Sequence, residues 1–171
     1  MALEEPAFEI IAEFDEIEIR RYEPYLVAEV DVASGNSAFR TLAGYIFGDN
    51  SDSKKMEMTA PVESRPAAQG NLQTYSFVME KKYTLDTLPE PEDKNIRILE
   101  RPERIVAARR FSGRWTEANF QRQLDALQTA LANNDIEISG PAEQARYNSP
   151  FTLPFMRRNE VIVPIVWPES R

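Results

Sequence analysis

An internal repeat constrains the fold of this chain more than any other feature of its sequence. The landmarks come in the same order in both halves: IEIR at 17–20 and IRIL at 96–99, a proline at 24 and 102, LVA at 26–28 and IVA at 105–107, and Ser-Gly at 34–35 and 112–113. The offset between the halves slips by a single residue. A duplicated unit predicts that the second half repeats the structure of the first.

Each copy follows the plan strand, strand, helix, strand, strand. In the first copy, alternating apolar residues predict strands over 8–12 and 17–20. Asp15 lies between them, at a hairpin turn or at the bend of one long strand. After Pro24 a more apolar strand is expected over 26–32.

The first helix carries two apolar stripes. The spacing i, i+3, i+4, i+7 predicts a core-facing stripe made of Phe39, Leu42, Ala43 and Ile46. A second stripe, turned about 100° from the first, contains Asn36, Arg40, Ala43, Gly44 and Phe47. Because Gly44 costs about 1 kcal/mol against alanine in a helix interior, it either leaves a slot for a flat ligand or lets a strand or loop pack closely.

The remaining elements follow from the same patterns. After the first helix we expect a strand over 56–62, a loop over 63–71 and a strand over 72–79. The second copy places its elements at 96–99, 105–107, a helix over 116–133, and strands at 145–148 and 161–166. The second helix should bury one side, formed by Phe120, Leu124, Leu127 and Leu131.

These elements predict an α+β fold. Neither half can cover both its sheet and its helix alone, so the two sheets should form one antiparallel, barrel-like core with a helix outside each half. We expect a single domain over 1–171, with pseudo-repeats at about 8–80 and 96–167.

Composition narrows the possible functions. With 20 Lys plus Arg and 28 Asp plus Glu, the net charge of −8 opposes phosphate backbones and anionic lipid surfaces, so nucleic acid is not an expected partner. The chain has no Cys and no His, which excludes thiolate metal sites and every Ser/His or Cys/His catalytic pair. No apolar run is long enough to span a membrane. We expect a soluble, cytoplasmic protein of unknown oligomeric state; the sequence would not show a leader that had been trimmed.

Three segments together resemble the SOUL family of haem-binding proteins. They are 17–22 followed by Pro24; the pattern FxxLxxYIxGxN at 39–50 with KMxMTxPV at 55–62; and RRNEV at 157–161. The resemblance covers nearly the whole chain. It implies a duplicated fold that forms a distorted antiparallel β-barrel flanked by two helices.

The resemblance also implies a tetrapyrrole site in an apolar groove between the first helix and a loop before the last strand. The loop would be 149–156, which we call the apolar loop. The candidate cofactor-binding residues are Asn36, Phe39, Arg40, Ala43, Gly44 and Phe47 from the helix, and Pro150, Phe151, Leu153, Phe155, Met156 and Arg157 from the loop. Arg157 is a candidate for a porphyrin propionate, whereas Arg158 and Glu160 are expected to form an ion-paired seam. The alternative is a loop that only closes the barrel.

The sequence departs from the family at the iron. Some members are proposed to ligate iron through His, which is absent here. A protein ligand would have to be Tyr, Met, Lys or a carboxylate, and Tyr45 and Met156 are the nearest candidates, although Tyr45 also suits the core. The other possibility is non-covalent binding of haem, or of another porphyrin, by burial alone.

The sequence therefore predicts reversible binding of a small planar hydrophobic ligand, for buffering, transport or sensing. We expect a binding protein rather than an enzyme. Two rival functions remain open: a tetrapyrrole-modifying enzyme, of the dechelatase or hydrolase kind, and a protein-interaction module. The enzyme would need a titrating group in the groove, for which Glu57 and Glu63 are candidates.

Overall fold

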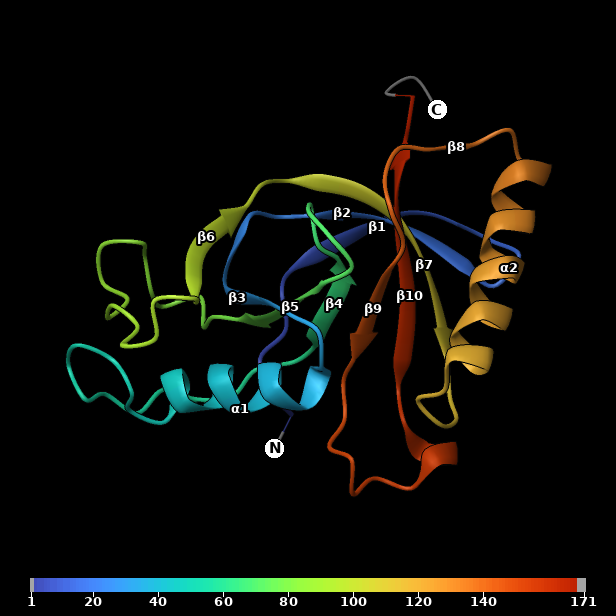
Figure 1. Cartoon of the computed structure of the whole chain (residues 1–171). Helices are drawn as coiled ribbons and strands as arrows, with labels where there is room; N and C mark the ends of the chain where they lie inside the picture. Colours follow the sequence, from blue (N-terminus) through green and yellow to red (C-terminus); the bar gives the residue numbers. More distant parts are fainter. Residues whose placement is uncertain (1, 169–171) are drawn as a thin grey trace. The chain divides into compact units, whose positions relative to one another are not determined.

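The computed structural model describes residues 2–168, which divide into two compact units (Figure 1). Unit 1 contains the start of the chain up to Pro6 together with Pro24–Pro102. Unit 2 contains Ala7–Glu23 together with the chain from Glu103 onward. Each unit holds its own hydrophobic cluster under one helix.

Unit 1 is an antiparallel sheet covered by one helix. Its elements are β3 (Tyr25–Val32), α1 (Gly35–Ile46), β4 (Val62–Pro66), β5 (Gln73–Val78) and β6 (Arg97–Arg101). The strand order is β4-β5-β3-β6. The helix packs on β3 and β5 through Ala38, Leu42, Tyr45 and Ile46, which are the buried residues of α1.

Unit 2 repeats this arrangement with two additional strands. Its elements are β1 (Phe8–Phe14), β2 (Ile17–Tyr22), β7 (Arg104–Phe111), α2 (Glu117–Asn133), β8 (Glu137–Ile138), β9 (Glu143–Arg146), the short 3₁₀ helix η1 (Pro154–Met156) and β10 (Asn159–Val166). The strand order is β1-β2-β7-β10-β9, with β8 paired to β10. Leu127, Ala130 and Leu131 are the buried residues of α2.

Each unit takes one strand from the other half of the sequence. β6 opens the second repeat but pairs with β3 of the first, where Ile98 lies opposite Ala28. β2 belongs to the first repeat but pairs with β7 of the second, where Ile19 lies opposite Ala107. These two pairs occupy equivalent positions in the two repeats, so the register itself shows the duplication.

The structure confirms the predicted α+β class and the duplicated strand-strand-helix-strand-strand plan. All pairs between the named strands of the described chain are antiparallel. The expected hairpin between β1 and β2 is present, and its turn residues Asp15 and Glu16 have positive φ angles of 50° and 62°. Two adjacent positive φ angles are typical of a tight type I′ turn.

The strand predicted over 56–62 was wrong. This segment makes single contacts instead of a ladder: the Met56 amide donates to Ile46 and the Ala60 amide donates to Glu4. Pro61 has no N–H to donate. The strand begins only at Val62 and runs through residues that we had predicted as loop.

The core face of α1 also differs from the prediction at one position. Leu42 and Ile46 are buried as expected, but Phe39 is 50% exposed. Ala38 and Tyr45 take the remaining buried positions. Phe39 keeps one edge against the core, since its ring meets the Phe77 ring at 5.5 Å in an edge-on arrangement.

Candidate functional site

The outer face of α1 is an exposed surface with two aromatic side chains. Phe39 and Phe47 are 50% and 57% exposed, with Asn36 and Arg40 exposed on the same helix. Ala43 is half-buried and packs against the core cluster. Five of the six residues predicted from the helix therefore lie in α1 and the sixth, Phe47, is its C-cap residue; four of the six are exposed.

The slot expected beside Gly44 is not empty. A Cβ built at Gly44 would lie 2.8 Å from the Asp49 Oδ2 atom. The Asp49 amide also donates to the Gly44 carbonyl, at 2.9 Å. Gly44 thus lets the turn after α1 pack closely, which was the alternative explanation for this glycine. Because the neighbour is the end of an exposed side chain, a ligand could displace it but would have to displace a negative charge.

Tyr45 is a core residue. Its side chain is fully buried, and its hydroxyl donates to the Pro89 carbonyl at 2.6 Å. Burial, with a smaller contribution from Tyr83, raises the pKa of Tyr45 to about 12. A protonated, buried hydroxyl that already has a partner is a poor iron ligand, so this position argues against Tyr45 as a metal-binding residue.

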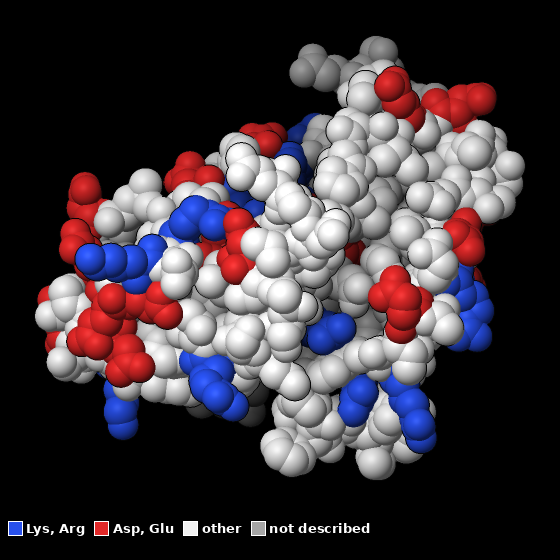
Figure 2. Space-filling view, in the orientation of Figure 1, with Lys and Arg blue, Asp and Glu red and all other residues white. Residues whose placement is uncertain are grey.

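The apolar loop, between β9 and β10, presents four large apolar side chains to solvent. Phe151 is 96% exposed, Phe155 73% and Met156 63%, and Leu153 and Pro150 are exposed as well. The connection lies at the bottom of Figure 2, where its surface is white with blue Lys or Arg atoms beside it and no red atoms on the face shown. The predicted loop residues therefore gather on one surface of unit 2.

Arg157 holds the apolar loop in shape. Its Nε donates to the Thr152 carbonyl and its Nη2 to the Pro150 carbonyl, both at 2.9 Å. Its guanidinium lies 4.3 Å from the centre of the Trp115 ring. Arg157 is therefore a structural residue of the loop, and a propionate would have to share it with two carbonyls.

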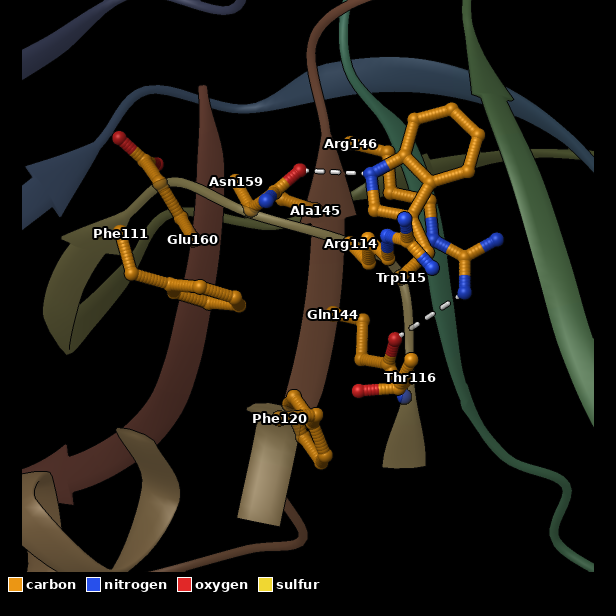
Figure 3. Close-up of a pocket in the computed structure, with 10 residues that line it drawn as sticks. All are labelled: Phe111, Arg114, Trp115, Thr116, Phe120, Gln144, Ala145, Arg146, Asn159 and Glu160. Carbon is orange, nitrogen blue, oxygen red and sulfur yellow. Dashed lines mark hydrogen bonds between the residues drawn. The ribbon is translucent and has the colours of Figure 1, made fainter. Parts of the chain in front are cut away.

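Trp115 is a central contact of this region that the sequence did not single out. Its indole N–H donates to Asn159 Oδ1 at 2.7 Å, and the Arg146 guanidinium lies 4.9 Å from its ring centre (Figure 3). Just before it, the Gly113 amide donates to the Pro154 carbonyl at 2.8 Å. The one sequence feature that could have indicated this role is the position of Trp115, between Arg114 and the N-cap residue of α2.

The cavity beside Trp115 is too small for a tetrapyrrole. It is lined by ten residues of unit 2: Phe111, Arg114, Trp115, Thr116, Phe120, Gln144, Ala145, Arg146, Asn159 and Glu160 (Figure 3). Its free volume is about 10 Å³, which is room for one water molecule. Two shallower depressions of unit 2 carry the carboxylates of Glu13, Glu16 and Glu18, or of Asp15 and Asp125, which disfavour an anionic ligand.

A buried ion pair fixes β10 in unit 2. Arg20 donates from Nη1 to Glu160 Oε1 at 2.7 Å and from Nη2 to Oε2 at 2.9 Å, and both side chains are fully buried. Tyr147 donates to Glu160 Oε1 at 2.8 Å, and Arg158 lies 3.3 Å from Oε2. The seam expected from Arg158 and Glu160 is therefore present, and the sequence analysis missed Arg20.

The charges of this pair set its protonation. Burial alone would raise the pKa of Glu160, but the Arg20 guanidinium outweighs it and holds that pKa below its usual range. Burial would likewise lower the pKa of Arg20, and the Glu160 carboxylate reverses this effect. Burial and the Glu160 charge raise the pKa of Tyr147. Arg20 therefore stays charged, Glu160 stays ionised and Tyr147 stays protonated, and these are the states in which the three groups bond one another. None of them exchanges a proton near neutral pH.

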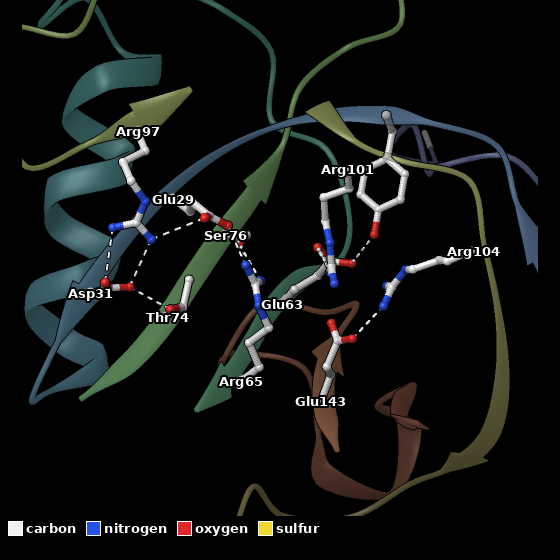
Figure 4. Close-up of polar contacts among 11 residues, drawn as sticks. Glu29, Asp31, Glu63, Arg65, Thr74, Ser76, Arg97, Arg101, Arg104 and Glu143 are labelled. Atoms are coloured by element: carbon white, nitrogen blue, oxygen red, sulfur yellow. Dashed lines mark hydrogen bonds and ion pairs between the residues drawn. The ribbon is translucent and has the colours of Figure 1, made fainter. Parts of the chain in front are cut away.

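Unit 1 has its own polar network. Glu29 accepts from Arg65 at 2.7 Å, Arg97 at 3.1 Å and Ser76 at 3.0 Å (Figure 4). Burial would raise the pKa of Glu29, but the Arg65 and Arg97 guanidiniums lower it below its usual value. Asp31, bonded by Arg97 and Thr74, also has a lowered pKa.

Glu63, proposed for acid or base chemistry, is buried, but its carboxylate is already hydrogen-bonded. Its carboxylate accepts from the Tyr25 hydroxyl at 2.7 Å and from Arg101 at 3.3 Å (Figure 4). Glu57, the other candidate, is exposed. Within residues 2–168, no group of three or more acidic side chains is placed to hold a metal ion, and no helix is long and apolar enough to cross a membrane.

The sequence relatives decide the family. The model of the SOUL heme-binding protein family matches residues 3–164. The chain belongs to the SOUL heme-binding protein family. Heme-binding protein 2 of Mus musculus is 30% identical, in an alignment that covers 94% of this chain and 85% of the relative. Heme-binding protein 2 of Homo sapiens is 31% identical, covering 84% and 75%.

Solved structures share the fold of this SOUL protein at low identity. A hydrolase from Listeria innocua aligns with a TM-score of 0.66 and 10% identity, covering 91% of this chain and 94% of that chain. The C-terminal domain of EcmrR aligns with a TM-score of 0.66 and 9% identity, covering 89% and 98%. At such identities the likeness concerns the fold alone.

Proposed function

We propose that this SOUL protein binds haem, or a related tetrapyrrole, reversibly and non-covalently, and that it buffers, carries or senses the ligand. The observation that carries the proposal is family membership together with an unusual surface. Four exposed apolar side chains crowd into the apolar loop, and two exposed aromatic rings lie on α1. Planar macrocycles bind through such apolar and aromatic surface.

The residues fit a porphyrin plane better than they fit its iron. Aromatic and aliphatic side chains can cover the macrocycle, while Arg40 on α1 and Arg114 beside the loop are exposed cations suited to propionates. The sequence has no His or Cys, so the protein can neither ligate haem iron through imidazole nor attach haem covalently through a cysteine side chain. The exposed thioether of Met156 stays the candidate iron ligand, and haem iron would supply only weak bonding to the protein.

Haemin titration of the full chain tests the proposal. We expect a shifted Soret band that saturates at stoichiometric addition. A spectrum that stays that of free haemin would overturn it.

Metal-free protoporphyrin IX sharpens the test. If burial of the macrocycle supplies most of the affinity, the metal-free ligand should bind within a few-fold of haemin, because about 25 cal/mol per Å² of apolar contact does not depend on iron. A much weaker affinity for the metal-free ligand would instead indicate that a protein group ligates the iron. Met156→Leu, which keeps the side-chain volume, would then identify that group.

Alternative functions have less support. An enzyme would need a titrating group at an apolar surface, but Glu63 is bonded by Tyr25 and Arg101, and Glu160 is bonded by Arg20. A protein-interaction module would also use the apolar loop. It would leave the Soret band of haemin unchanged in the titration.

A further inference from the structure

The apolar loop has features that haem binding does not require. Its apolar side chains are exposed, and several of its backbone polar groups already have hydrogen-bond partners within the protein. The Phe151 amide donates to Ser149 Oγ, the Thr152 amide to the Ser149 carbonyl, and the Met156 amide to the Leu153 carbonyl.

Several carbonyls of the loop also accept hydrogen bonds. Arg157 donates to those of Pro150 and Thr152, and the Gly113 amide donates to that of Pro154. Pro150 and Pro154 themselves have no N–H. Entry into an apolar medium is costly for backbone groups that lose water without a partner, so these bonds lower the cost of moving the loop out of water.

The charge around the loop runs against that of the whole chain. Residues 144–159 contain three Arg and no Asp or Glu, and so do residues 109–116, in a chain of net charge −8. The two segments meet where the Gly113 amide bonds Pro154 and where Trp115 stacks on Arg157. Arg110 and Arg158 offset the buried Glu160, and Glu117 lies nearby in the first turn of α2. Arg109 pairs with Glu16, and Arg146 lies over the Trp115 ring, so Arg114 and Arg157 remain as the cations beside the exposed tip.

We propose that the apolar loop inserts into the interface of an anionic lipid bilayer. Phe151, Leu153, Phe155 and Met156 would enter the boundary between head groups and acyl chains. Arg114 would meet lipid phosphate and carboxylate groups, and Arg157, which is bonded within the loop, would add its positive charge. The arginine at the base of the loop is held by Trp115, so the tip is preorganised for insertion. Since charges act over about 8 Å at physiological salt, this local positive charge outweighs the distant acidic residues.

Vesicle sedimentation with the haem-free, full-length chain tests this inference separately from haem binding. Vesicles made of equal parts phosphatidylcholine and phosphatidylserine should pull down the protein, and vesicles of phosphatidylcholine alone should pull down much less. Raising the salt concentration should weaken the first interaction. A chain that stays in the supernatant with both vesicles would overturn the inference, whatever its haem affinity.

Variants separate insertion from charge attraction. The double variant F151S/F155S should lower the partition coefficient at least about tenfold, because it removes the largest inserted surfaces. Arg114→Ala should lower it about fivefold on anionic vesicles only. Leu85→Ser is the control: Leu85 is an exposed apolar residue of unit 1, at 54%, and its substitution should not change binding.

A second copy of the chain is the rival occupant of this surface. Sedimentation velocity of wild type and F151S/F155S distinguishes it. If the wild type is a dimer that the substitutions dissociate, and the vesicles capture neither, the loop is a subunit contact and the membrane inference is wrong. The membrane inference would also be overturned if F151S/F155S bound the anionic vesicles with the same partition coefficient as the wild type.

Discussion

The two units build the same strand arrangement, β4-β5-β3-β6 under α1 in one and β9-β10-β7-β2 under α2 in the other, but they differ in the surfaces they add. Unit 1 exposes aromatic rings on its helix, at Phe39 and Phe47. Unit 2 has a polar helix surface and exposes its apolar residues on the connection between the third and fourth strands of its repeat. The equivalent connection of unit 1, residues 67–72, is a short turn without aromatic residues, and its one large exposed apolar side chain is Leu72.

The interiors differ as well. At equivalent positions, unit 1 pairs Tyr25 with Glu63, whereas unit 2 pairs Arg104 with Glu143. The dominant polar group of unit 1 is Glu29, held by partly exposed arginines, and that of unit 2 is Glu160, held by the fully buried Arg20. The pairing register thus repeats between the units, while the polar contacts and surface loops have diverged.

The largest difference should appear when each network loses one arginine. Arg20→Met leaves the buried Glu160 with only Arg158, Arg110 and Tyr147, and should cost about 3 kcal/mol of unfolding free energy. Arg97→Met in unit 1 should cost about 1 kcal/mol or less, because Arg97 is nearly half exposed. Urea unfolding followed by circular dichroism measures both. Equal losses would show that the two networks are energetically alike.

Acid should weaken both networks. The folded-state pKa values of Glu160 and Glu29 lie below the ordinary glutamate value of about 4.5, which we take for the unfolded chain. The unfolded chain therefore binds more protons, so these carboxylates contribute their full stability above that value and lose it as the pH falls through the folded pKa. Unfolding midpoints in urea, measured from neutral pH downward, should fall. Glu160→Gln should be less stable throughout but should show a flatter decline, and an unchanged slope would contradict this account.

Single substitutions show which unit supplies the haem contact. Phe47→Ser on α1 and Phe155→Ser in the apolar loop should each weaken haemin binding by roughly tenfold, the expected loss for one aromatic contact. Leu85→Ser is the control for a general effect of exposed apolar residues. If only one of the two Phe variants changes the Soret titration, the ligand is bound by that unit's surface alone.

The smallest expected difference lies at the helix caps. Thr116 accepts a hydrogen bond from the Asn119 amide at 3.1 Å, whereas the Ser34 side chain makes no such cap bond. Thr116→Ala should therefore cost about 1 kcal/mol and Ser34→Ala close to none. Thermal or urea unfolding of the two variants resolves this difference, and a large loss in Ser34→Ala would show that its hydroxyl has another role.

Periodicity carried most of the fold prediction. The alternation in β1 and β2, the apolar stripe of α2 and the repeated landmarks each reflect a local pattern that burial imposes on the chain. The exchange of β2 and β6 between the units was not predicted, because a repeat shows which segments are equivalent and not which copy each one joins. The strand at 62–66 was missed because its alternation is weak and Pro61 and Pro66 bound it.

The site was harder to predict for a related reason. A glycine at position 44 indicates a missing side chain, but it does not reveal that Asp49, five residues later, fills the space. Arg157 stood out as a cation near the apolar loop, but its bonds to Pro150 and Thr152 depend on how the loop folds back. The exposure of Phe151 and Phe155 could be expected, since the loop has too many apolar residues for its length to bury.

The crossed pairing of β2 and β6 links the fates of the two sheets. β6 of unit 1 is followed directly by β7 of unit 2. Separating β6 from β3 should therefore also disturb the start of β7, so we expect unfolding of one unit to destabilise the other. If the chain is cleaved between the halves, for example after Asn95, the first fragment should lack β6 of unit 1 and carry β1 and β2 of unit 2. The second fragment should lack β1 and β2 and carry β6. We expect the two fragments to associate by exchanging these strands, as in a domain-swapped dimer.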